Sequence, residues 1–144
     1  MLFDGRIEPQ DILQGALGDC YFLSAVAALA EKEERIIQIF GDQPGKDNGI
    51  YKVTLRINGI IEEIIVDDYV PVNKAGHPIF CQPNKNEIWV PLFEKAWAKA
   101  NGSYANISAG SPTEIFKAAT YAPSEVFETK PTLEENESLW RLIL

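Results

Sequence analysis

The sequence contains a single histidine, His77, and only two cysteines, Cys20 and Cys81, in 144 residues. Two cysteines are too few for a disulfide framework, which favours a reducing, cytoplasmic setting. Any histidine-based catalysis by this chain alone would have to use His77. The glycine and proline that flank His77 are typical of an ordinary surface loop.

Long apolar runs and basic residues are also scarce. No stretch of about 18 apolar residues occurs, so no transmembrane helix is expected, and the first residues lack the basic and apolar parts of a signal peptide. The 13 lysines and arginines are outnumbered by 21 aspartates and glutamates, which gives a net charge of −8. That balance argues against nucleic acid or an anionic membrane as a partner.

The residues that are present suffice for a folded interior. Hydrophobic residues make up 46% of the chain and aromatic residues 10%, and a chain of this length usually forms one domain with a buried core. We therefore predict that residues 1–144 form a single domain. The apolar pattern at residues 139–144 is followed by no glycine, cap or polar tail, which predicts that the chain is a piece of a longer protein.

Helical periodicity appears in four places. Residues 20–30 are apolar on nearly every face, which is typical of a helix buried at the centre of a domain. Residues 36–40 indicate a further short helix, and residues 87–100 carry apolar side chains at helical spacing. A capping box with proline at the first helical position opens a helix over residues 112–119.

Strand signals lie between these helices, so the predicted fold class is α+β. Residues 50–57 alternate in polarity and are followed by Asn58-Gly59, a strong hairpin signal. Residues 60–66 then return as the partner strand of a small antiparallel hairpin. Residues 79–81 indicate one more short strand.

The segment that leads into the central helix predicts a nucleophile. Residues 14–21 read QGALGDCY, so Cys20 stands at the helix start, where unpaired N–H groups and the helix dipole favour a thiolate. Gln14 can donate a hydrogen bond to a developing oxyanion beside the Cys20 N–H. The alternative is that Cys20 is a small core residue, but Gln14, the glycines and the helix start together favour the nucleophile.

This segment resembles the nucleophile motif of calpains, the calcium-dependent cysteine proteases. Four further segments resemble calpain motifs in the same order along the chain: residues 49–51, 66–72, 87–104 and 108–111. The resemblance covers nearly the whole chain. It implies a papain-like calpain protease core lobe, namely the N-terminal half of the core that bears the cysteine.

The resemblance also implies an activity, that of an endopeptidase with a Cys-His-Asn triad acting on proteins and peptides. It makes Cys20 the nucleophile, Gln14 the oxyanion-hole donor and Gly110 a contact to the substrate backbone. The histidine and asparagine have no match, because in papain-like enzymes the histidine lies ~130–150 residues after the cysteine, beyond Leu144. A second lobe downstream in the full-length chain is thus the implied partner, and the chain alone is expected to be inactive.

Calcium is the cofactor that the resemblance implies. The matching ligands are the backbone carbonyls of Phe3 and Gly5 and the carboxylates of Asp11 and Glu87. Calcium takes about six to eight oxygen ligands of these kinds, and the net negative charge favours a cation. The alternative is that Asp11 and Glu87 only cap the loop and the helix in which they lie.

Two other functions can be weighed against that of a protease. The chain can instead be a non-catalytic calpain-like scaffold or interaction module, since its second lobe is missing. A thiol oxidoreductase is disfavoured because no Cys-x-x-Cys motif occurs. Tyr21 and Ala109 stand where the family usually has tryptophan and glycine, which affects substrate contacts more than the fold.

Overall fold

The computed structural model describes residues 1–82, 86–128, 136–137 and 140–141. Its helices are α1 (Cys20–Ala30), α2 (Glu33–Phe40), α3 (Trp89–Ala100) and α4 (Pro112–Thr120), and its strands are β1 (Ile50–Ile57) and β2 (Ile60–Asp67). Three single-turn 3-10 helices are η1 (Pro9–Asp11), η2 (Lys46–Asn48) and η3 (Ala105–Ile107). The fold class is therefore α+β, as predicted.

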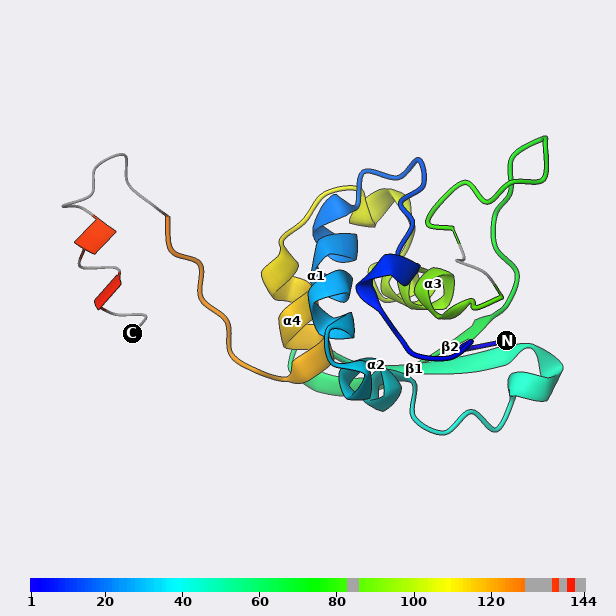
Figure 1. Ribbon diagram of the computed structural model, residues 1–144, viewed down its shortest axis with the longest axis horizontal. Helices are drawn as coiled ribbons and strands as arrows, with labels where there is room; N and C mark the ends of the chain where they lie inside the picture. Colours follow the sequence, from blue (N-terminus) through cyan, green and yellow to red (C-terminus); the bar gives the residue numbers. More distant parts are fainter. Residues whose placement is uncertain (83–85, 129–135, 138–139, 142–144) are drawn as a thin grey trace.

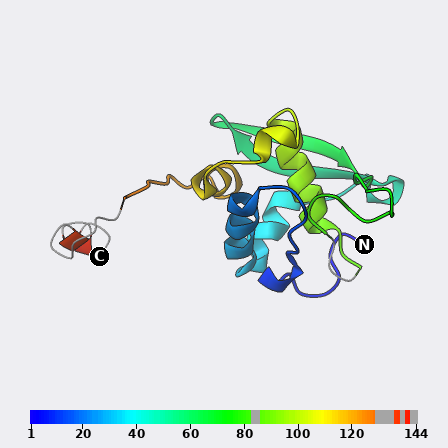
Figure 2. The same ribbon diagram turned by 90° about the horizontal axis from the view of Figure 1, so that it is seen from above.

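The helices gather on one face of the β1–β2 hairpin (Figures 1 and 2). Helix α1 packs against α2, α4 and η1, while α3 packs against both strands. After α4 the chain leaves this body as an extended segment, drawn in orange in Figure 1. None of the described helices is long and apolar enough to cross a membrane.

Aromatic rings join α1, α2 and α3 at the centre of the core. The Phe22 ring lies edge-on to Phe93 with centroids 5.2 Å apart and is stacked with Trp97 at 6.5 Å. Phe40 meets Phe93 edge-on at 6.4 Å. Trp89 is also fully buried, so both tryptophans of α3 belong to the core.

Helix α1 is central but is not buried on every side. Most of its residues are buried, as predicted, yet Cys20, Ser24 and Ala28 are exposed. Their spacing of four residues places them on one face of the helix. The prediction that the helix is buried on every side is wrong for this face. Its side chains are small, so their exposure leaves little apolar surface in contact with water.

Local signals fix the hairpin and α4 as predicted. Asn58 and Gly59 both have positive φ, 50° and 84°, which is the geometry of a two-residue hairpin turn with the twist of the flanking strands. At the start of α4 the Thr113 N–H donates to Ser111 Oγ and the Ser111 N–H donates to Glu114, both at 3.4 Å. This is the capping box that the sequence predicted.

Other predicted boundaries differ. Helix α3 begins at Trp89 rather than residue 87, and residues 79–81 form no strand. Isolated bridges pair Leu13 with Gln82 and Val72 with Pro78 instead, because the backbone of this segment bonds to the loop before α1. The predicted apolar helix at residues 139–144 lies largely outside the described residues.

Two neighbouring isoleucines of α2 allow a matched test of this core. Ile36 is fully buried, whereas the Ile37 side chain is 47% exposed. Replacing Ile36 by alanine should lower the free energy of unfolding by roughly 2–5 kcal/mol, because it leaves a cavity. The same change at Ile37 should cost less than about 1 kcal/mol. Urea unfolding followed by circular dichroism measures both, and equal losses would contradict the placement of α2.

Candidate active site

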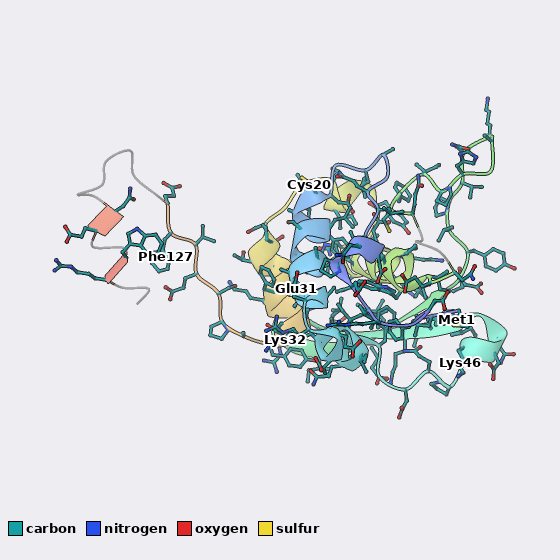
Figure 3. All side chains as sticks on the ribbon, in the orientation of Figure 1. Met1, Cys20, Glu31, Lys32, Lys46 and Phe127 are labelled. Carbon is teal, nitrogen blue, oxygen red and sulfur yellow. The ribbon has the colours of Figure 1, made fainter. Side chains whose placement is uncertain are left out.

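Cys20 stands exposed at the first residue of α1, at one end of the helix (Figure 3). The N–H groups of Phe22 and Leu23 donate to the Asp19 carbonyl at 2.8 and 3.1 Å. Within the described part of the chain, the Cys20 N–H has no acceptor. A thiol and an unpaired N–H therefore share the helix end at which the dipole favours negative charge.

Gln14 is exposed on the loop that leads to Cys20. Its side-chain Nε2 donates to the Leu17 carbonyl at 3.4 Å, a long and therefore weak bond. The backbone around Gln14 is held firmly by residues 79–82: the Ala16 N–H donates to Ile79 and the Gln82 N–H donates to Leu13, both at 2.9 Å. The position of the loop is thus fixed while the amide stays accessible.

Close backbone contacts explain two glycines of this loop. A Cβ added to Gly15 would lie 1.7 Å from the Phe80 carbonyl oxygen, and one added to Gly18 would lie 3.1 Å from the Ser108 carbonyl oxygen. The loop therefore runs between residues 79–80 on one side and residue 108 on the other. At position 15 in particular, any side chain would displace the backbone that carries Gln14.

Gly110 is brought to the same end of α1 by its contact with Tyr21. A Cβ at Gly110 would lie 2.6 Å from the Tyr21 ring, so glycine is needed here for packing alone. The Tyr21 hydroxyl accepts a hydrogen bond from the Trp97 Nε1–H at 3.1 Å. Because Tyr21 follows Cys20 directly, Gly110 packs against the first turn of α1.

His77 lies in a loop that closes on itself. Its N–H donates to Asn73 Oδ1 at 3.1 Å, and the Asn73 N–H donates to the His77 carbonyl at 2.8 Å. The loop of residues 73–77 projects away from α1 in both views (Figures 1 and 2). This arrangement agrees with the prediction of an ordinary loop residue, and it leaves Cys20 without an imidazole from this chain.

A pair of acids beneath Cys20 was missed by the sequence analysis. Asp19 and Glu94 are each 1% exposed, and Glu94 accepts the Cys81 N–H on its two oxygens at 3.2 and 3.1 Å. Burial, followed by the hydrogen bond to Asp19, raises the pKa of Glu94 to about 8. The signal in the sequence was a glutamate in the middle of the apolar face of α3.

Of the predicted metal ligands, Glu87 lies against the N-terminal segment. Glu87 is 2% exposed, and its Oε2 accepts the Asp4 N–H at 3.5 Å. The Ile88 N–H also bonds to the carbonyls of the first two residues. The N-terminal segment that carries Phe3 and Gly5 is therefore held against Glu87.

Asp11 is buried at the end of η1, with 3% of its surface exposed. Its Oδ2 accepts the Glu8 N–H at 2.7 Å, so the capping role weighed for Asp11 is part of the structure. The described residues hold no group of three or more His, Cys, Asp or Glu that could bind a metal. A cation here would need backbone carbonyls as well as the two buried carboxylates, which suits the hard, oxygen-seeking calcium ion.

Comparison with known proteins agrees with this arrangement. The family described as "Calpain family cysteine protease" matches residues 1–144. The chain is 44% identical over 110 residues to "Calpain-type cysteine protease DEK1" of Zea mays, covering 76% of this chain and 5% of that protein. It is 38% identical over 124 residues to "Calpain-8" of Homo sapiens, covering 83% and 18% respectively.

A third relative extends the match along the chain. The "Calpain-1 catalytic subunit" of Macaca fascicularis is 36% identical over 138 residues, which is 93% of this chain and 19% of that protein. The chain thus spans about one-fifth or less of the length of these relatives. Since the family match covers every residue, the chain belongs to the calpain family of cysteine proteases.

Proposed function

We propose that this chain is the cysteine-bearing lobe of a papain-like, calcium-dependent cysteine endopeptidase that cleaves cytoplasmic proteins. The observation that carries the proposal is the exposed Cys20 at the start of a helix whose other faces are buried. Residues 1–144 form the N-terminal half of the catalytic core. The second half lies downstream in the full-length protein and brings the histidine and the asparagine.

In the proposed reaction Cys20 acts as a thiolate. Its Sγ attacks the carbonyl carbon of a substrate peptide bond, and the Cys20 N–H and the Gln14 amide hold the resulting oxyanion. The C–N bond then breaks, and the leaving amine takes a proton from the histidine of the second lobe. Water hydrolyses the thioester, which releases the acyl product and restores the thiol.

Gly110 is the proposed contact to the substrate backbone. It packs on Tyr21, the residue after Cys20, and it offers a carbonyl and an N–H with no side chain in front of them. A backbone contact of this kind orients the substrate and is indifferent to the substrate's side chains. It therefore suits an enzyme that cleaves proteins of varied sequence.

The second lobe is needed because this chain offers no proton carrier for the reaction. His77 is held in its own turn, away from α1. The exposed face of α1 that begins at Cys20 gives a downstream lobe room to place a histidine against the thiol. Triad residues act as a unit, so the 144-residue chain alone is expected to lack measurable peptidase activity.

The proposed calcium ligands are the carbonyls of Phe3 and Gly5 and the carboxylates of Asp11 and Glu87. Bound calcium would neutralise the two buried carboxylates and tie the N-terminal segment to the start of α3. That segment leads directly into the loop of Gln14. Calcium binding would therefore steady the oxyanion hole without taking part in the chemistry.

The catalytic assignment is tested by peptidase kinetics on the full-length protein. Cys20→Ser should lower kcat by about 1,000-fold or more, since the nucleophile is lost. Gln14→Ala should lower kcat by about 100- to 1,000-fold with little change in KM, because its amide acts on the oxyanion. Gln38→Ala is the matched control, since Gln38 is an exposed glutamine on α2.

Two results would contradict the assignment. Retention of activity in Cys20→Ser would remove Cys20 from the reaction. A full-length sequence without a Gly-His and an Asn-Pro-Trp segment after Leu144 would favour the alternative of a non-catalytic scaffold.

Calcium binding is tested by thermal unfolding of the 144-residue chain. At calcium concentrations about 100 times the Kd, the melting temperature should rise by roughly 5–10 °C by mass action. The double variant Asp11→Asn, Glu87→Gln should lose the rise. The double variant Asp42→Asn, Glu62→Gln makes the same charge change at exposed sites and should keep it. The site does not exist if the wild-type chain shows no calcium-dependent shift.

A further inference from the structure

Two carboxyl groups meet in the interior directly beneath the start of α1. Asp19 and Glu94 are each 1% exposed. Asp19 precedes the helix, where an aspartate ordinarily accepts a hydrogen bond from the first backbone N–H groups. Its side chain makes no such bond. It is buried instead, as is Glu94, and the two carboxyl groups interact with each other.

Within the described ranges, neither acid forms an ion pair with a lysine, arginine or histidine. Both buried Asp19 oxygens also lack any hydrogen-bond partner there. Two ionised carboxylates can only accept hydrogen bonds. One proton on either group makes it a donor to the other and removes one of the two buried charges.

The proton belongs on Glu94. Burial and the bond to Asp19 raise the pKa of Glu94 to about 8, and burial raises the pKa of Asp19 as well. In the part of the chain that the structure describes, the other titratable groups that face the pair are Cys81, Tyr104 and, next to Asp19, Tyr21. Burial raises the pKa of each of these three, so they stay neutral while Glu94 titrates.

The pair connects to both donors of the proposed oxyanion hole. Asp19 is covalently joined to Cys20. Glu94 holds the Cys81 N–H at 3.2 and 3.1 Å from its two oxygens. Residues 79–82 in turn bond to the loop that carries Gln14, through Ile79 and Gln82.

We propose that Asp19 and Glu94 share one proton and act as positioning residues, which hold the Cys20 N–H and the loop of Gln14 in one fixed arrangement. The inference rests on the proposed function, in which these two donors receive the oxyanion. When the proton is lost in alkaline solution, two buried like charges repel each other. The segment before Cys20 and the segment around Cys81 are then driven apart.

The variant Glu94→Gln isolates the effect of the proton. Its amide nitrogen can donate to Asp19 and its amide oxygen can accept the Cys81 N–H, so it imitates the protonated glutamate at every pH. In the wild type the native state keeps a proton up to about pH 8 that the unfolded state releases near 4.5. Rising pH in this window favours unfolding, by up to about tenfold in the unfolding equilibrium constant per pH unit. Glu62→Gln is the matched control, because Glu62 is exposed on β2.

Urea unfolding of the 144-residue chain between pH 5 and 9.5 measures this difference. The unfolding constant of the wild type relative to Glu94→Gln should rise about tenfold per pH unit around neutrality and level off above about pH 8, while Glu62→Gln follows the wild type. The backbone amide resonances of residues 15–20 should shift with the same midpoint in the wild type and stay constant in Glu94→Gln. A constant ratio, or amide signals that do not titrate, would overturn the proposal.

A second measurement serves if Glu94→Gln does not fold. Infrared spectra of the wild-type chain should show the carbonyl stretch of a protonated carboxylic acid at pH 7 and lose it above pH 9. Its absence at pH 7 would overturn the shared proton.

The test separates this inference from the proposed function. In the full-length enzyme the kcat of the wild type should fall above about pH 8 more steeply than that of Glu94→Gln, with similar KM values. Suppose that the full-length enzyme is active but the ratio of the unfolding constants of the wild type and Glu94→Gln does not change with pH. That result would refute the positioning role of Asp19 and Glu94 and leave the proposed function intact. If Cys20→Ser retained activity, the proposed function would fail, but the pH dependence of unfolding and of the amide resonances would be unchanged. The two failures are therefore distinguishable.

Discussion

The packing of the Phe22 ring against α3 is the contact on which the rest of the structure depends. The ring meets Phe93 edge-on and stacks with Trp97, so α1 can neither slide nor turn without breaking both aromatic contacts. Cys20 lies two residues earlier, in the same helical turn. Its exposure and its place at the helix start follow from where that ring is anchored.

The loop before α1 is held in a different manner, by backbone rather than by side chains. Gly15 lies against the Phe80 carbonyl and Gly18 against that of Ser108, while two hydrogen bonds join the loop to residues 79–82. The Gln14 side chain itself adds only one long bond within the loop, to the Leu17 carbonyl at 3.4 Å. The site thus combines a rigid main chain with an accessible amide, which is the arrangement that preorganised electrostatic stabilisation requires.

Local chemistry was enough to predict the elements that depend on neighbours in sequence. The Asn58-Gly59 turn and the Ser111 capping box each need only a few consecutive residues, and both formed as predicted. The same reasoning placed Cys20 at a helix start. The roles of Cys20 and Gln14 in catalysis stay predictions, because the histidine and asparagine of the proposed triad have no match in this chain.

Contacts between distant segments could not be predicted. Residues 79–81 were predicted to form a strand, but tertiary packing instead bonds the segment 79–82 to the loop before α1. Asp19 has the sequence position of a helix cap, yet its side chain makes no cap bond. It lies in the interior with Glu94, 75 residues later in the chain. The position of Glu94 on the apolar face of a helix was the one sequence signal that its carboxyl group is buried. The residues near Glu94 in the sequence gave no indication that Asp19 is its partner.

The hairpin has a consequence for how the protein behaves at high concentration. Among the described residues, β1 and β2 form a two-stranded sheet, so each strand has an outer edge that could pair with another chain. The Gln43 side chain already bonds to the Lys52 N–H and carbonyl on β1, and Lys99 donates to the Ile65 carbonyl on β2. Exposed isoleucines at positions 50, 61 and 65 add apolar surface to the outer face. The Lys52–Glu63 ion pair lies between them. Charges set within such a face oppose sheet-to-sheet stacking, so the chain's colloidal stability depends on surface residues that have no part in its fold or chemistry.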